Sequence, residues 1–201
     1  SNLAALPFEE EQAKAVELGL KSNFAANRVQ VNAAVFQSKH DDFQVQSFTQ
    51  LSNGGTALTV TNAAEVTTQG FEADAQWVAT DWLRFWGAYG YTDAEFDDFR
   101  NCAAGGLDCT GNRPVGAPKN SWNLGVQLTY PMLGGEFFVQ SDYTSRDEFY
   151  SNPDNRPVNL NESLSLLNGR MGWNSAAGKW SVTAWGRNLT DEATQTWNTR
   201  S

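Results

Sequence analysis

Two carboxylates with close spacing are the first groups in this sequence that could serve catalysis. Glu72 and Asp74 lie in the stretch GFEADAQW, where polar and apolar residues alternate from Gly70 to Trp77. This alternation indicates a β-strand with both carboxylates on one face, about 6–7 Å apart, a separation at which they could act as acid and base on a glycoside. Arginines on other expected strands could instead pair with them: Arg28, Arg84 and Arg170. We expect this second, structural role.

Other residue clusters are weaker candidates for chemistry. The acidic stretches 40–43 and 93–99 could ligate a divalent cation through carboxylate oxygens, but they lack the spacing of an EF-hand loop. We therefore expect solvated loop acids and no metal site. With His40 as the one histidine, no Ser/His/Asp or Cys/His arrangement can be assembled, and no glycine-rich loop is placed to cradle phosphate. We expect no catalytic residues, no enzymatic activity and no cofactor.

The two cysteines, Cys102 and Cys109, lie in the glycine-rich stretch NCAAGGLDCTGN. A disulfide between them would contribute about 2–3 kcal/mol by constraining the unfolded chain, and it would suit an oxidising compartment. A zinc site would need more ligands than two cysteines. The sequence leaves the pairing of these thiols open, and the disulfide is an expectation.

Composition excludes several classes of protein. The chain has 201 residues and a formal net charge of -9, so it can form one substantial domain and is too acidic to bind nucleic acid. No segment approaches the roughly 18 consecutive apolar residues of a transmembrane helix. The eight Trp, five Tyr and twelve Phe suit either the aromatic girdles of a membrane β-barrel or the core of a soluble β-sandwich. No signal peptide is recognisable, which suggests a mature or internal fragment.

The hydrophobic pattern predicts an all-β chain. Period-two alternation marks eight strands, at residues 16–24, 28–36, 62–77, 82–94, 121–130, 136–146, 163–173 and 179–189. Short turns near residues 26, 80, 133 and 176 alternate with long polar loops at 38–65, 95–119 and 147–161. Outer-membrane β-barrels have this arrangement, with short periplasmic turns and long extracellular loops, and they use strands of similar length.

Aromatic residues mark both ends of the expected strands. Trp77, Tyr130, Trp173 and Trp180 lie beside short turns, whereas Tyr89, Tyr91, Trp122 and Tyr143 lie toward long loops. Two such belts are typical of strands that cross a bilayer. With the short turns in the periplasm, the first strand begins outside and the eighth ends outside. We therefore expect a partial antiparallel transmembrane β-barrel, about 8–10 strands of a larger up-and-down barrel.

Six segments follow one another between residues 6 and 192: ELGLKSNF, RVQVNAAVFQSKHDDFQVQ, GFEADAQW, GYTDAEF, PKNSW and GRNLTDE. In this order they resemble the C-terminal half of TonB-dependent outer-membrane receptors. The resemblance implies a bacterial outer-membrane barrel of about 22 strands, a plug domain, and uptake of an iron–siderophore complex, cobalamin or a glycan with energy from TonB. We expect residues 1–201 to be a single domain, the C-terminal portion of such a barrel, with the plug domain and the last strand absent.

The expected ligand contacts lie in the loops 43–61, 95–118 and 149–160, with Phe48, Phe99, Arg100 and Tyr150 as candidate binding residues. Expected partners are outer-membrane lipid, the remaining strands and plug domain of the parent receptor, TonB through the absent N-terminal part, and a small-molecule ligand such as a siderophore. A passive porin-like or structural barrel is one alternative, and an upstream plug domain would decide against it. A soluble all-β carbohydrate-binding domain is the other, and it would purify without detergent.

Overall fold

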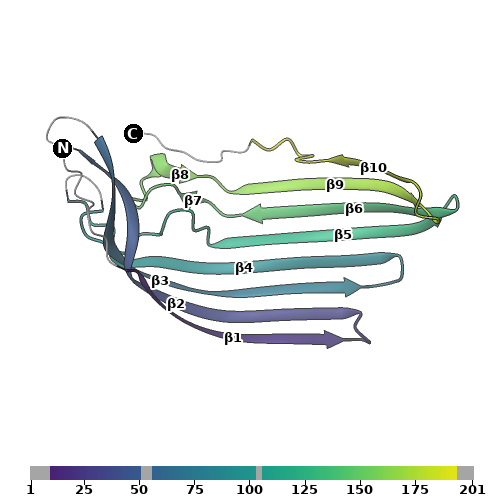
Figure 1. The fold of residues 1–201 in the computed structure, drawn as a ribbon, viewed down its shortest axis with the longest axis horizontal. Coiled ribbons are helices and arrows are strands. Elements are labelled where there is room, and N and C mark those ends of the chain that lie inside the picture. The colour runs from purple at the N-terminus through teal and green to yellow at the C-terminus, as the bar shows by residue number, and fades with distance from the viewer. Residues whose placement is uncertain (1–9, 51–55, 103–105, 194–201) are drawn as a thin grey trace.

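In the part of the chain that the structure describes, eight antiparallel strands form the main sheet (Figure 1). The computed structural model describes residues 10–50, 56–102 and 106–193, with the backbone alone described at 46–50 and 56–63. In sheet order the strands are β1 (Gln12–Phe24), β2 (Val29–Gln50), β3 (Thr56–Val78), β4 (Leu83–Asp98), β5 (Asn120–Met132), β6 (Gly135–Arg146), β9 (Leu164–Ser175) and β10 (Ser181–Gly186). The predicted all-β, up-and-down arrangement is confirmed.

Each strand of this sheet pairs with its neighbours in the sequence, except where β6 pairs with β9. The segment between these two strands forms a small hairpin of β7 (Phe149–Tyr150) and β8 (Leu160–Asn161), with a single 3₁₀ turn, η1 (Pro157–Asn159), before β8. Among the described residues, no helix is long and apolar enough to cross a membrane.

The two ends of the sheet differ in their connections. Short turns join β1–β2, β3–β4, β5–β6 and β9–β10 at one end, and long connections follow β4 and β6 at the other (Figure 1). The β5–β6 turn consists of Leu133 and Gly134, which both have positive φ (52° and 66°), the geometry of a two-residue type I′ hairpin. The predicted alternation of short turns and long connections is therefore present at the connections after β4 and β6.

The sheet has one apolar and one polar face. On β1, Val16, Leu18 and Leu20 are 76%, 75% and 63% exposed. The continuous register keeps apolar residues on this outward face, because Leu18 pairs with Val35 and Val35 pairs with Phe71. A soluble protein rarely exposes such a continuous apolar surface. This surface argues against the soluble carbohydrate-binding alternative and is the kind of face that meets lipid.

Aromatic rings cover glycines on the polar, inner face. The cross-strand pairs are Phe36 with Gly70, Trp86 with Gly125, and Phe138 with Gly172. A Cβ added at Gly172 would lie 2.8 Å from Phe138 Cε1 and 2.6 Å from the Val182 carbonyl oxygen. Only glycine leaves room for a ring to lie this close to the backbone of the next strand, so these pairs favour one register over its neighbours.

The β2–β3 connection differs from the long polar loop predicted at residues 38–65. Both strands continue through this region, since β2 ends at Gln50 and β3 begins at Thr56. The register shifts between His40 and Phe43, where Asp42 has a φ of 56°, and the hairpin curves away from the rest of the sheet (Figure 1). Strands of 22 and 23 residues exceed the length needed to cross a bilayer. Their outer halves have a polar composition that resembles that of a loop.

Candidate ligand-binding surface

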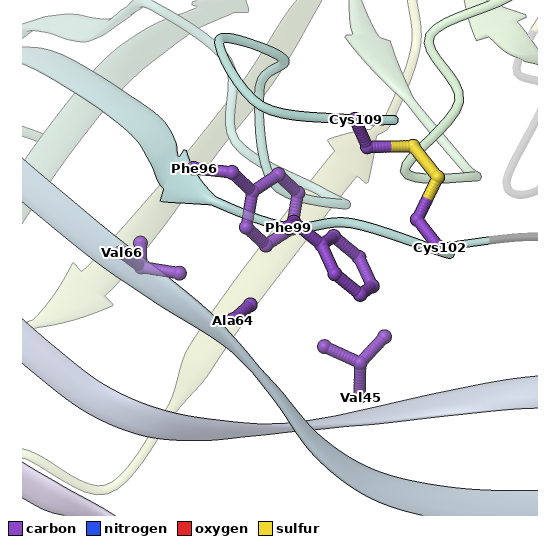
Figure 2. Close-up of a cluster of buried hydrophobic side chains, with 7 residues drawn as sticks. All are labelled: Val45, Ala64, Val66, Phe96, Phe99, Cys102 and Cys109. Atoms are coloured by element: carbon purple, nitrogen blue, oxygen red, sulfur yellow. A yellow bond between two sulfur atoms is a disulfide. The ribbon is translucent and has the colours of Figure 1, made fainter. Parts of the chain in front are cut away.

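A buried hydrophobic cluster holds the β4–β5 connection against the outer part of the β2–β3 hairpin, residues 43–50 and 56–66, which we call the β2–β3 extension (Figure 2). Its members are Val45, Ala64, Val66, Phe96, Phe99, Cys102 and Cys109. The rings of Phe96 and Phe99 lie 4.8 Å apart at their centroids. Val66 and Phe96 are cross-strand partners that continue the inner face of β3 and β4. The connection therefore folds over the inner side of the wall at its outer end.

Backbone hydrogen bonds and a disulfide close the same connection into a compact loop. Cys109 N donates to Phe99 O at 2.9 Å, and Gly111 N donates to Phe96 O at 2.8 Å. Cys102 and Cys109 form a disulfide beside the Phe99 ring (Figure 2). The sequence left this pairing open, and the structure shows a disulfide between cysteines that are 7 positions apart. The loss of chain entropy in the unfolded state gives a stabilisation of about 2–3 kcal/mol for a loop of this length.

A second contact joins the β4–β5 connection to the β6–β9 connection. Asn155 Oδ1 accepts a hydrogen bond from Arg113 N, and Asn155 Nδ2 donates to Arg113 O, both at 2.9 Å. The Arg113 guanidinium lies over the Tyr150 ring, 5.0 Å from its centroid, and 3.8 Å from a Glu148 carboxylate oxygen. The β2–β3 extension and the connections 99–119 and 147–163 are therefore joined, and we call them the outer-loop unit.

Asp154 organises the β6–β9 connection from within. Its side chain is 4% exposed and pairs with Arg156 Nε, and it accepts hydrogen bonds from Asn159 Nδ2 at 2.8 Å and Arg156 N at 3.2 Å. Burial works to raise the pKa of Asp154, but the hydrogen bonds outweigh burial and lower this pKa below its usual value of 3.8. The ionised carboxylate therefore stabilises the folded connection.

A polar pocket of about 380 Å³ lies where the β4–β5 and β6–β9 connections meet the C-terminal part of β4. Its lining includes Asp93, Glu95, Arg113, Lys119 and Tyr150. Lys119 Nζ lies 3.0 Å from Asp93 Oδ1. The hydrogen bond to Asp93, followed by the charge of that carboxylate, raises the pKa of Lys119 above 10.5. The pocket thus combines fixed charges of both signs with one aromatic ring.

The residues predicted to contact ligand have different surroundings. Phe99 is 2% exposed inside the hydrophobic cluster, and this burial argues against the predicted ligand contact. A loop that folds on itself needs a core of its own, and Phe99 supplies it. Arg100 is 77% exposed, with Nε 3.3 Å from Asp98 Oδ1, and Tyr150 is half-buried beneath Arg113. Phe48 lies in β2, at a position whose side chain is outside the described residues.

Glu72 and Asp74 lie on the inner face of β3, as the alternation predicted. Asp74 Oδ2 accepts a hydrogen bond from Asn32 Nδ2 on β2 at 2.9 Å. Two arginines expected as partners bind other groups: Arg28 pairs with Asp81 at 2.6 Å, and Arg170 donates to Gln140 at 2.7 Å. The prediction that arginines pair with Glu72 or Asp74 is therefore wrong for Arg28 and Arg170. Each of these arginines instead bonds a group on an adjacent strand or turn.

The acidic stretches form ion pairs with nearby basic groups. Asp41 carboxylate oxygens lie 3.6 Å from Lys14 Nζ and from Lys39 Nζ, and His40 Nδ1 lies 3.2 Å from Glu11 Oε1. Over residues 10–50, 56–102 and 106–193, no three His, Cys, Asp or Glu side chains are grouped so as to hold a metal ion.

The residues that join the outer-loop unit were missed by sequence reasoning. Asn155 has a φ of 48° in the stretch SNPDN, whose composition signals a turn but not a partner. Its contact with Arg113 spans 42 positions of sequence. No local sequence pattern near Arg113 predicts its contact with Asn155, and none near Lys119 predicts its ion pair with Asp93.

Comparison with known proteins agrees with this architecture. The family model described as "TonB dependent receptor-like, beta-barrel" matches residues 2–189. The metal-pseudopaline receptor CntO of Pseudomonas aeruginosa is 30% identical over 124 residues, which cover 62% of this chain and 16% of that receptor.

Solved structures show the same fold. The ferric yersiniabactin uptake receptor FyuA from Yersinia pestis superposes with a TM-score of 0.73 at 20% identity, covering 90% of this chain and 25% of that one. BauA, the ferric preacinetobactin receptor from Acinetobacter baumannii, gives a TM-score of 0.69 at 21% identity, covering 92% and 27%. The chain therefore spans about a quarter or less of these relatives. It belongs to the TonB dependent receptor-like β-barrel family, whose members are outer-membrane proteins of Gram-negative bacteria.

Proposed function

We propose that this chain supplies wall strands and outer loops to a receptor that takes up a scarce nutrient across the outer membrane, with energy delivered through TonB. A metal chelate of the siderophore class is the favoured ligand, because the relatives described above are named as receptors for metal-pseudopaline, ferric yersiniabactin and ferric preacinetobactin. Cobalamin and glycans are the other ligand classes that the resemblance implies. The plug domain and the contact with TonB belong to parts of the receptor outside this chain, and no catalytic step is assigned to it.

The observation that carries this proposal is the outer-loop unit. A buried cluster, a disulfide and the reciprocal bonds between Arg113 and Asn155 join connections from different hairpins. A surface braced in this way is ordered before a ligand arrives, so binding costs less conformational entropy. A receptor gains affinity from such bracing, whereas a passive pore has no ligand for which this surface would need to be ordered.

Two of the predicted contact residues fit this role. Arg100 is an exposed cation at the edge of the unit and can donate charge-assisted hydrogen bonds to the anionic oxygens of a chelate. Tyr150 lines the polar pocket together with Arg113. We propose both as ligand contacts, and Phe99 as the residue that holds Arg100 in place from beneath.

Uptake by the full-length receptor tests the proposal. Cells that lack the receptor are complemented with it and given radioactive iron on a catecholate, a hydroxamate or a carboxylate chelator. We expect saturable uptake of one chelate that a protonophore abolishes. Arg100→Ala should weaken the apparent affinity several-fold, whereas Arg28→Ala, at a turn on the opposite end, should not. Unsaturable uptake that resists the protonophore would support the passive porin instead.

A further inference from the structure

We propose that a row of polar side chains on the inner face of β4, β5, β6 and β9 is a transit site for the anionic groups of the transported chelate. The row, which we call the arginine row, consists of Arg84, Gln127, Gln140 and Arg170. It lies in the half of the wall nearer the short turns, away from the outer-loop unit. The inference rests on the proposed uptake function and adds the part of the wall along which the chelate passes.

The register of the sheet places the four side chains of the arginine row on one line. Arg84 pairs with Gln127, Gln127 with Gln140, and Gln140 with Arg170. The four strands lie side by side in the wall (Figure 1). Arg84 is two residues before Trp86, whose ring lies on the inner face, so period-two alternation places the row on that face too. Three strand spacings, about 14 Å, separate the two arginines.

Carboxylates do not neutralise the two arginines of this row. Within the described part of the chain, Arg84 is exposed and forms no hydrogen bond or ion pair. Arg170 donates from Nε and Nη2 to Gln140 Oε1, at 3.0 and 2.7 Å, and this amide oxygen carries no net charge. Asp142 is two residues further along β6, and it accepts a hydrogen bond from Gln140 Nε2 at 2.9 Å. Positive charge is therefore in excess along the row.

A third guanidinium lies beside the row on β10. Trp185 pairs with Arg170, and the Arg187 guanidinium lies over the Trp185 ring, 5.5 Å from its centroid. The Arg170 guanidinium likewise lies 5.6 Å from the centroid of the Phe138 ring. An aromatic ring positions a guanidinium without removing its charge. Both cations are thus held against the wall and remain able to bind an anion.

This excess of positive charge runs against the composition of the chain, whose formal net charge is -9. The inner face of β3 carries carboxylates instead, Glu72 and Asp74. Positively charged side chains that line a pore select anions, and passage requires several weak sites rather than one tight site. Guanidinium groups form charge-assisted hydrogen bonds with the anionic oxygens of a chelate. The arginine row has the chemistry of one such site.

A carboxylate of the plug domain is the other anion that this row could bind. One acidic side chain would reach one of the two arginines, because Arg84 and Arg170 are about 14 Å apart. A chelate that carries several anionic groups meets both. The transported chelate is therefore the occupant to which we commit, and anchoring of the plug is an outcome that the experiment detects.

Uptake by the full-length receptor, expressed in cells that lack it, tests the inference. The probes are radioactive iron on a catecholate, a hydroxamate and a carboxylate chelator. In the double variant Arg84→Gln, Arg170→Gln, the maximal uptake rate should fall about tenfold, because charge-assisted hydrogen bonds are lost. Binding of the same chelate to de-energised cells should be unchanged. The matched control is Arg28→Gln, whose side chain pairs with Asp81 outside the row, and it should keep the wild-type rate.

A lysine variant separates charge from packing. Arg84→Lys, Arg170→Lys keeps both charges, but lysine cannot reproduce the two hydrogen bonds from Nε and Nη2 to Gln140 Oε1. The maximal uptake rate should return to within about threefold of the wild type, because the row acts through its charge. A rate that stays as low as in the glutamine variant would show that the arginines only support the wall, and it would overturn the transit site.

Heat-modifiable gel migration shows whether each variant is assembled. If the double glutamine variant does not assemble, Arg84→Gln alone tests the row, and a wild-type rate in that variant would count against the site. Entry of a large glycopeptide antibiotic through the double variant, but not through the wild type, would assign the row to the plug and overturn the proposal. If the wild type takes up none of the three chelates, the proposed function fails and the row with it. If the wild type and the double variant transport equally, the row alone fails.

Discussion

Replacement of Phe99 by alanine tests whether the outer-loop unit is held by its own hydrophobic core. Phe99 is 2% exposed, and its ring lies 4.8 Å from that of Phe96. Truncation of a buried phenylalanine to alanine costs about 3–5 kcal/mol. Because about 1.4 kcal/mol corresponds to a factor of ten, the equilibrium for local opening of the loop should rise about 100- to 4000-fold.

Hydrogen exchange in the full-length receptor measures this opening directly. The amides of Cys109 and Gly111 donate across the loop to Phe99 O and Phe96 O, so their exchange reports on its closure. In Phe99→Ala both amides should exchange faster by the factor given above. Removal of the disulfide by a double Cys102→Ala and Cys109→Ala change should have a smaller effect, since its contribution is about 2–3 kcal/mol.

The neighbouring Arg100 is the matched control. Its side chain is 77% exposed and its ion pair with Asp98 is solvated, so Arg100→Ala should change the exchange no more than about fivefold, or about 1 kcal/mol. If Phe99→Ala exchanged at the wild-type rate and weakened chelate binding as much as Arg100→Ala, the reasoning would be refuted. Phe99 would then be a ligand contact and the cluster would contribute little.

Three other tests separate the roles of wall, register and loop. Ala73→Arg, on the outward face, should block outer-membrane assembly at a cost of about 2–4 kcal/mol, whereas Asp74→Arg on the inner face should assemble; equal losses on heat-modifiable gels would contradict the assignment of faces. Gly125→Val should impair assembly because its side chain would occupy the space of the Trp86 ring, and adding Trp86→Ala should restore it, or else the ring is not the obstacle. The folded pKa of Asp154 lies below its usual 3.8, so its stabilisation is present above about pH 4 and is lost as pH falls through the lower folded value. Asp154→Asn should remove this acid dependence from hydrogen exchange of the β6–β9 connection, and an unchanged profile would argue against the carboxylate.

The barrel wall was predictable from sequence because the face on which each residue lies follows from its position along its own strand. Leu18 is 75% exposed to the lipid side, and the next residue along the strand faces the other way whatever its partner is. The alternation that placed Asp74 on the inner face needed no knowledge of the hydrogen bond from Asn32. Two solvents, hydrocarbon and water, impose this pattern on every strand.

The loops were predictable only in position, because their structure depends on distant contacts. Arg113 and Asn155 are 42 positions apart, and nothing near either residue signals the other. Phe99 was assigned to ligand because an aromatic residue in a polar loop has no local sign of burial, yet Val45 and Val66 from another hairpin cover it. The β2–β3 extension was predicted as a loop because its composition is as polar as that of a loop.

The neighbour-to-neighbour order of the strands also determines how the described sheet resists force. A force that separates neighbouring strands of the described sheet must break one strand pairing at each boundary. The boundary between β6 and β9 should need the largest force, because the connection between these strands is also fastened to residues 112–116 through Arg113 and Asn155. The brace that orders the outer surface would then act as the mechanical lock of this part of the barrel.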